Sequence, residues 1–213
     1  MAADTPDEKK VRPSETSAED LPDVPVFQDE FTRGFMKSLE EAEPGFYVFE
    51  SGTKAYELWL PEETIIEEKS YSLEAEGEFE TFLATIEHSN KSITQLHATF
   101  VNYSEPNLVD RNLDNINLKS KKELDFEKIN SKGQTIYLAE LERTHDEEYG
   151  ERFGYIAFVQ SPEGVGSLEL LYDSFCSEEN TNDCGQKLTG EKQKQNILII
   201  SSSIKFKGND ENE

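Results

Sequence analysis

Short apolar runs separated by turn-forming residues constrain the fold of this chain more than any other feature. The stretch GFYVFESGTKAYELWLP holds two such runs around Ser51-Gly52, and Pro61 ends the second because it donates no ladder hydrogen bond. The stretches KELDFEKINSKGQTIYLAELERT and FGYIAFVQSPEGVGSLELLYDSF repeat the pattern around Ser131-Lys132-Gly133 and Pro162-Glu163-Gly164. This pattern predicts antiparallel β-hairpins.

A longer hairpin is predicted for EFETFLATIEHSNKSITQLHATFVNY, with its turn at Ser89-Asn90-Lys91. Its second arm also fits a helical period through Ile93, Leu96 and Phe100, but its threonines favour a strand. The stretch YSEPNLVDRNLDNINLKS contains a proline and four asparagines, so we expect a connecting loop with one helical turn.

Two helices are predicted at the ends of the domain. In PVFQDEFTRGFMKSLEEAEPG, Phe27, Phe31, Phe35 and Leu39 recur every four residues, and Pro44-Gly45 would end the helix. Such a stripe could serve a groove-binding partner helix, but we expect it to pack on the chain's own sheet. A second helix is expected over about residues 187–202, followed by a short strand, although its β-branched residues would also suit a strand.

The fold class expected from these elements is α+β, an antiparallel meander sheet packed against an N-terminal and a C-terminal helix. We expect a disordered acidic tether over residues 1–24, a single domain over 25–207 and a disordered tail over 208–213. The thirteen Phe, eight Tyr and one Trp supply large apolar surfaces for the core of this domain.

The formal net charge of −24 restricts the partners of the chain. Phosphate backbones and anionic lipid headgroups repel such a surface, so nucleic acid is not expected as a partner. Cations, basic proteins and cell-surface polymers remain, and the charge itself favours a soluble monomer. The sequence contains no apolar run of about 18 residues, so no transmembrane span is expected.

The first residues, MAADTPDEKKVRPSETSAEDLPDVP, lack the apolar core of a signal peptide. A disordered acidic segment of this kind often tethers a domain. It would fit a bacterial lipoprotein in which an initiator Met stands where the lipidated cysteine was, with the lipid anchor upstream of Met1. A cytosolic protein with a disordered N-terminus is the other interpretation.

The order of these elements resembles the PsbP-like superfamily. The hairpin that ends in YELWLP, the antiparallel strands and the closing helix that runs into IISSSIKF carry the resemblance, over about residues 45–206. The superfamily includes an extrinsic photosystem subunit, Mog-type Ran-binding proteins and small bacterial lipoproteins. In this chain Pro61 is followed by EETII, whereas the family usually has Gly-Trp there. The resemblance implies a non-enzymatic binding or assembly factor and assigns no binding residue.

The two cysteines, Cys176 and Cys184, flank a polar loop and are predicted to form a structural disulfide. Such a bond would pin the end of a strand to the start of the last helix, and disulfides persist outside the cytosol. Two unrelated buried thiols and a redox pair are the alternatives. The spacing is not Cys-x-x-Cys, and no cation beside either residue would activate a thiol.

The stretch ENTNDCGQKLTGE has the glycine and the final glutamate of a calcium loop, at Gly185 and Glu191. Its first ligand position would be Asn180 instead of aspartate, and its fifth would be Cys184, a poor ligand for a hard cation. No metal site is therefore predicted.

The remaining chemical groups form no recognisable catalytic motif. His88, His97 and His145 lack metal-binding spacing, although His88 and His97 could lie close together across their hairpin. Ser202 and Lys205 have the spacing of a Ser-x-x-Lys motif without its partner motifs. The acids Asp146, Glu147, Glu148 and Glu151 could form a cation site or a docking patch, but a solvated loop is the preferred interpretation.

These observations favour a non-catalytic domain without catalytic residues or cofactor. We expect it on the extracellular face of a bacterial cell membrane, lipid-anchored, where it would bind an unknown protein or polymer. One alternative is an intracellular interaction module that docks a basic partner. The other is a hydrolase that uses an unidentified pair of carboxylates.

Overall fold

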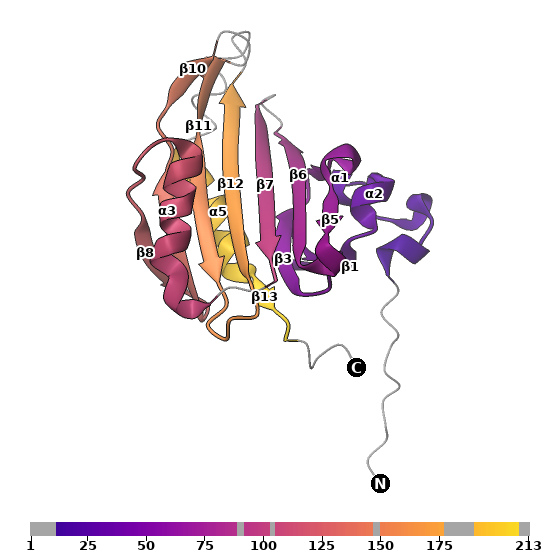
Figure 1. The fold of residues 1–213 in the computed structure, drawn as a ribbon. Coiled ribbons are helices and arrows are strands. Elements are labelled where there is room, and N and C mark those ends of the chain that lie inside the picture. Colours follow the sequence, from indigo (N-terminus) through magenta and orange to yellow (C-terminus); the bar gives the residue numbers. More distant parts are fainter. Residues whose placement is uncertain (1–11, 89–91, 103–104, 147–149, 177–189, 209–213) are drawn as a thin grey trace.

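The structure is a computed structural model that describes residues 12–88, 92–102, 105–146, 150–176 and 190–208. It contains two antiparallel sheets (Figure 1). The small sheet has the order β1 (Met36–Glu43), β2 (Phe46–Glu50), β3 (Tyr56–Pro61) and β13 (Lys205–Phe206). The large sheet has the order β4 (Thr64–Ile66), β6 (Phe79–Glu87), β7 (Ile93–Val101), β12 (Ser167–Cys176), β11 (Gly150–Gln160), β9 (Gln134–Glu140) and β8 (Glu127–Ser131), with β5 (Ser72–Glu74) beside β6 and β10 (Thr144–Asp146) beside β11.

The four predicted hairpins form as the sequence indicates: β2–β3, β6–β7, β8–β9 and β11–β12 are antiparallel pairs. In the β8–β9 turn, Lys132 and Gly133 both have positive φ, at 49° and 82°. This is the backbone of a type I′ turn, whose twist matches that of the strands. The α+β class is confirmed, but the sheet is not one meander, since β7 pairs with β12 instead of β8.

The long N-terminal helix was predicted wrongly. Only two short helices form, α1 (Pro25–Gln28) and α2 (Glu30–Arg33), because Asp29 between them is extended and its carboxylate accepts the Thr32 N–H at 2.8 Å. The chain then continues as strand β1, in which Met36 pairs with Phe49. Backbone pairing in the sheet therefore overrides the helical period. Phe35 still contacts its predicted neighbour Phe31, with ring centroids 5.2 Å apart.

The connection after β7 was also predicted wrongly. A 3-10 turn, η5 (Pro106–Leu108), leads into the 12-residue helix α3 (Val109–Ser120) instead of a loop. Leu113 and Ile116 lie on one side of α3 and pack against Ile156 and Phe158 of β11. The asparagines concealed this helix, because asparagine has low helix propensity and favours turns. Packing on the sheet compensates for that preference.

The chain crosses one face of the large sheet through α3 and returns to the other face through α5 (Gly190–Ser203) (Figure 1). The predicted closing helix and the strand after it, β13, are confirmed, apart from residues 187–189, which lie outside the described part. The boundaries of the tether, domain and tail stay predictions. Residues 12–24 include the 3-10 turns η1 (Pro13–Glu15) and η2 (Ala18–Asp20), and Pro13 and Leu21 are buried.

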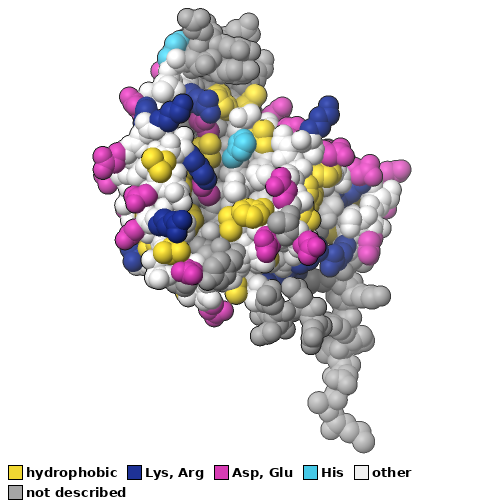
Figure 2. Space-filling model, viewed as in Figure 1, with side chains coloured by type: hydrophobic (Ala, Val, Ile, Leu, Met, Phe, Trp, Pro, Cys, Tyr) yellow, Lys and Arg dark blue, Asp and Glu magenta, His cyan; other side chains and the backbone are white. Residues whose placement is uncertain are grey.

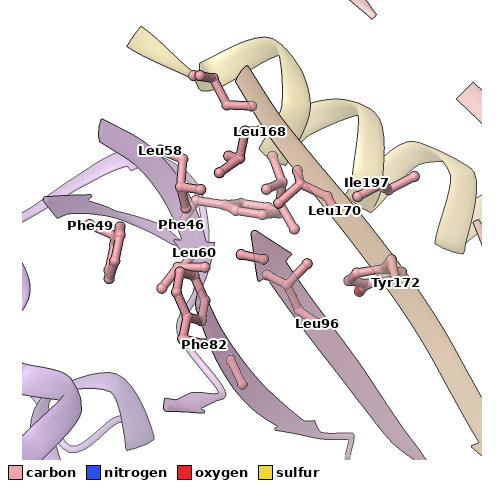
Figure 3. Packing of buried hydrophobic residues seen from close by; sticks show 14 of the residues in the cluster. Phe46, Phe49, Leu58, Leu60, Phe82, Leu96, Leu168, Leu170, Tyr172 and Ile197 are labelled. Carbon is pink, nitrogen blue, oxygen red and sulfur yellow. The ribbon is translucent and has the colours of Figure 1, made fainter. Parts of the chain in front are cut away.

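The main core lies between the large sheet on one side and the small sheet with α5 on the other (Figure 3). Its largest fully buried side chains include Phe49, Tyr56, Phe82, Phe100 and Tyr172. At its margin the buried carboxylate of Glu80 accepts the Gly52 N–H at 2.8 Å and the Tyr71 hydroxyl at 3.0 Å. Two 3-10 turns, η3 (Glu68–Ser70) and η4 (Ala75–Gly77), flank β5 beside this contact.

Ion pairs link the C-terminal end of the domain to the small sheet. The ammonium of Lys207 lies 2.9 Å from Glu50 and 2.7 Å from Glu57, and Lys54 lies 2.8 Å from Glu50. Partial burial of Glu50 raises its pKa, but the hydrogen bonds and charges of Lys54 and Lys207 outweigh this and lower the pKa to about 2. The ordinary pKa of 4.5 applies in the unfolded chain.

A pH dependence follows, because the folded chain holds Glu50 ionised where the unfolded chain protonates it. The stabilisation is complete above pH about 4.5 and is lost as the pH falls towards about 2. Between pH 4.5 and about pH 2 the wild type should therefore lose more unfolding free energy than Glu50→Gln, which lacks the titrating carboxylate. We expect a difference of only about 1 kcal/mol, because solvent screens the ion pairs. Urea unfolding at several pH values measures this. The exposed control Glu163→Gln should leave the profile unchanged, and an unchanged profile for Glu50→Gln would contradict the assignment.

Candidate functional site

One face of β6, β7 and β12 is covered by no helix in the part of the chain that the structure describes (Figure 1). Side chains alternate along these strands, so every second one points into the core and the others point outward. On β6 and β7 the inward positions from Phe82 to Ile86 and from Thr94 to Phe100 are buried. The outward positions constitute what we call the open face: Phe79, Thr81, Leu83, Thr85, Glu87, Ile93, Gln95, His97, Thr99, Val101, Ser167, Glu169, Leu171, Asp173 and Phe175.

Several large apolar side chains are exposed or half-buried on the open face, where a solvated sheet would carry polar ones. Phe79 is 46% exposed and Ile93 is 39% exposed, while Leu83, Val101 and Leu171 are half-buried between them. Exposed apolar side chains that gather on one face are a feature of interaction sites on soluble proteins. Figure 2 shows hydrophobic side chains and a histidine on this face, with Asp, Glu, Lys and Arg around them.

Helix α3 forms a ridge beside the open face, and a groove of about 390 Å³ runs between them. Val101, Leu118 and Phe158 contribute its apolar lining, and Thr99 and Asn115 its polar lining. An ion pair between Lys119 of α3 and Glu169 of β12, at 2.9 Å, also borders the groove. The lining of the groove is therefore partly apolar and partly polar.

A second cavity, of about 260 Å³, lies at the C-terminal end of α3, beside Ser120. Asp173 on its wall has a side chain that is 5% exposed and bonded to the guanidinium of Arg152. Burial raises the pKa of Asp173, although Arg152 partly offsets the effect. Glu142, on the same cavity, is fully exposed and has its pKa lowered by Lys122. Each carboxylate is thus bound to a cation, and the two pKa shifts are opposed because Asp173 is buried whereas Glu142 is exposed.

A chain of polar side chains crosses the end of the core beside a smaller cavity of about 180 Å³. The Thr94 hydroxyl lies 2.8 Å from both His88 Nε2 and the Ser174 hydroxyl. Burial lowers the pKa of His88, while burial and the nearby Glu63 raise that of Glu62. Thr94 and Ser174 are fully buried, so neither hydroxyl can reach a substrate in this conformation.

The two histidines predicted to lie close together do not meet. The β6–β7 register places His97 opposite Leu83, on the open face, whereas His88 bonds to Thr94 on the core side. They lie on opposite faces because side chains alternate along the chain, and His88 is an odd number of positions after Leu83, the residue opposite His97. His145 is exposed in β10.

The predicted Cys176–Cys184 disulfide lies outside the described residues, because these include neither Cys184 nor the side chain of Cys176. The calcium-loop positions from Asn180 to Gly185 also lie outside them, and Glu191 lies in the first turn of α5. Glu147 and Glu148 fall in the undescribed segment 147–149, next to Asp146 in β10 and the exposed Glu151 in β11.

Ser202 and Lys205 form no reactive pair. The Ser202 hydroxyl donates to the Ile199 carbonyl at 3.2 Å, within its own helix, and Lys205 is exposed in β13. Within the described residues, no group of three or more His, Cys, Asp or Glu side chains could hold a metal ion.

The open face was missed from the sequence, although a signal for it was present. In FETFLATIE and in ITQLHATFV, apolar residues occur at both the odd and the even positions of the strand. The pattern therefore does not predict that one side of each strand is buried and the other solvated. The outward set keeps Phe79, Leu83, Ile93 and Val101. Which side α3 would cover depends on the crossover after β7, which the local pattern does not specify.

None of the helices in the described part of the chain combines the length and apolar character that a membrane span requires. No solved structure matches the chain. A curated relative from Bacillus subtilis (strain 168), "Putative lipoprotein YvcA", is 28% identical in an alignment of 203 positions that covers 92% of this chain and 82% of the relative. Residues 22–205 match the family YvcA_Mog1p, described as "Putative lipoprotein YvcA". The match covers the core, the open face and α5, and it agrees with the PsbP-like lipoprotein branch indicated by the sequence. The chain therefore belongs to the YvcA_Mog1p family.

Proposed function

We propose that this chain is the binding domain of a lipoprotein, held at the outer surface of a bacterial membrane and without catalytic activity. The name of the Bacillus subtilis relative and the acidic N-terminal segment support the anchored location. We also propose that the domain binds its partner through the open face. The observation that carries this part is the row of outward apolar side chains on β6 and β7, which no helix covers in the described chain.

The anchored location is tested in the native cells, with the gene expressed from its own start. An alkyne-labelled fatty acid fed to the cells should become attached to the protein, and protease added to wall-stripped intact cells should degrade it. A cytosolic protein of the same cells, neither labelled nor degraded, is the control. If the protein is unlabelled and protected as well, the intracellular interaction module replaces this proposal.

One observation favours a second candidate, a hydrolase that uses carboxylates. Asp173 and Glu142 border one cavity and have opposed pKa shifts, which is a feature of acid–base pairs. The ion pairs argue against it, because Arg152 and Lys122 already bind the two carboxylates, which would have to leave these cations to act on a substrate.

A further inference from the structure

Beside the β6–β7 half of the open face lie three glutamates that have no cation partner among the described residues. The strands β4, β5, β6 and β7 contain no Lys or Arg, and their outward positions include Glu74 beside Phe79 and Glu87 beside Ile93. Glu67, just after β4, reaches the same side, since its carboxylate accepts the Thr85 hydroxyl at 3.1 Å. All three glutamates are exposed.

The acids of the other half are paired with cations, which makes this half distinct. On β12, Lys119 pairs with Glu169 and Arg152 with Asp173. Among the residues that the structure describes, no Lys or Arg lies within ion-pair distance of Glu67, Glu74 or Glu87.

The unpaired acids stand directly beside apolar side chains. The ladder register places Phe79 opposite Val101, Leu83 opposite His97, and Glu87 opposite Ile93. Directly opposite residues in an antiparallel pair lie within about 5 Å of each other at their Cβ atoms. A ligand that covers the apolar positions would therefore also bring its own groups to the carboxylates.

We infer that the open face binds a segment of a partner protein in which Lys or Arg side chains accompany apolar ones. This inference rests on the proposed function and adds the chemistry of the partner. Apolar side chains of the segment would cover Phe79 and Leu83, and its cations would pair with Glu67, Glu74 and Glu87. A second copy of the chain fits less well, because it would bring another net charge of −24 to an already acidic surface.

The test uses the complete chain and three short peptides in which threonine and leucine alternate with Lys, Gln or Glu. Fluorescence anisotropy measures affinity, and NMR chemical shifts of the labelled protein locate the bound peptide. The Lys peptide should bind about tenfold more tightly than the Gln peptide, and added salt should remove most of the difference. The Glu peptide should bind more weakly than either.

Matched variants separate this site from general attraction to an acidic protein. The triple variant Glu67→Gln, Glu74→Gln, Glu87→Gln should lose about tenfold in affinity for the Lys peptide. The control Glu15→Gln, Glu19→Gln, Glu30→Gln changes the net charge equally at exposed positions outside the open face and should lose little. Equal losses in both variants would overturn the inference.

The remaining outcomes distinguish the inference from the proposed function. If the Gln peptide shifts the open-face signals and binds as tightly as the Lys peptide, the open face binds but the inferred charge preference is wrong. If no peptide shifts these signals, or the shifts lie elsewhere, the proposed binding surface fails as well. A dimer formed through this face, detected by sedimentation without peptide, would also overturn the inference.

Discussion

Phe49→Ala should lower the free energy of unfolding by about 4 kcal/mol. Phe49 is fully buried, and its ring lies 5.5 Å from that of Phe35, 6.1 Å from Tyr56 and 5.1 Å from Phe82. Phe49 and Tyr56 belong to the small sheet and Phe82 to the large sheet, so the cavity would open where the two sheets meet.

Chemical denaturation of the wild type and the variant measures this loss. Leu118→Ala is the matched control, because Leu118 is 75% exposed on α3 and its loss should change the stability by about 0.5 kcal/mol or less. A loss below about 1 kcal/mol for Phe49→Ala would mean that this ring does not join the two sheets.

Gly154→Ala should cost about 3 kcal/mol, although it adds one methyl group. A Cβ atom at Gly154 would lie 2.1 Å from the Tyr172 carbonyl oxygen and 2.8 Å from the Asp173 Cα. Both atoms belong to the backbone of β12, so relief of the clash requires β11 and β12 to separate at the centre of the sheet. The same movement would disturb the contact between Arg152 and Asp173.

Thermal unfolding compares this variant with Gly208→Ala, where an added Cβ would meet no atom within 4 Å. The control should unfold at the wild-type temperature, and Gly154→Ala well below it. Equal melting temperatures for the two variants would show that β11 and β12 are not as close at this point as described.

The hairpins could be predicted from the sequence because their signals are local. Turn residues such as Lys132-Gly133 and the two-residue period specify a strand pair without reference to the rest of the chain. The segment 36–43 could not be predicted in this way, since its preference for a helix is overridden by pairing with β2. Helix α3 likewise depends on Ile156 and Phe158, which are distant in the sequence.

The candidate site was harder to predict, because it consists of what the fold leaves uncovered. His97, Thr99 and Val101 have no chemical signature in the sequence, and they become a surface only because α3 packs over β9 and β11 instead of β6 and β7. The residues that looked chemically active in the sequence have structural roles instead. His88 completes a buried hydrogen-bond chain, and Ser202 bonds to its own helix.

The most direct test of the binding face is photo-crosslinking in the native cells. A photoreactive residue at His97, which is exposed near the centre of the open face, should form a covalent adduct with a discrete partner. The same residue at Glu19 or Glu163, both exposed outside this face, should form none. Adducts from either control position and none from His97 would show that the partner binds elsewhere.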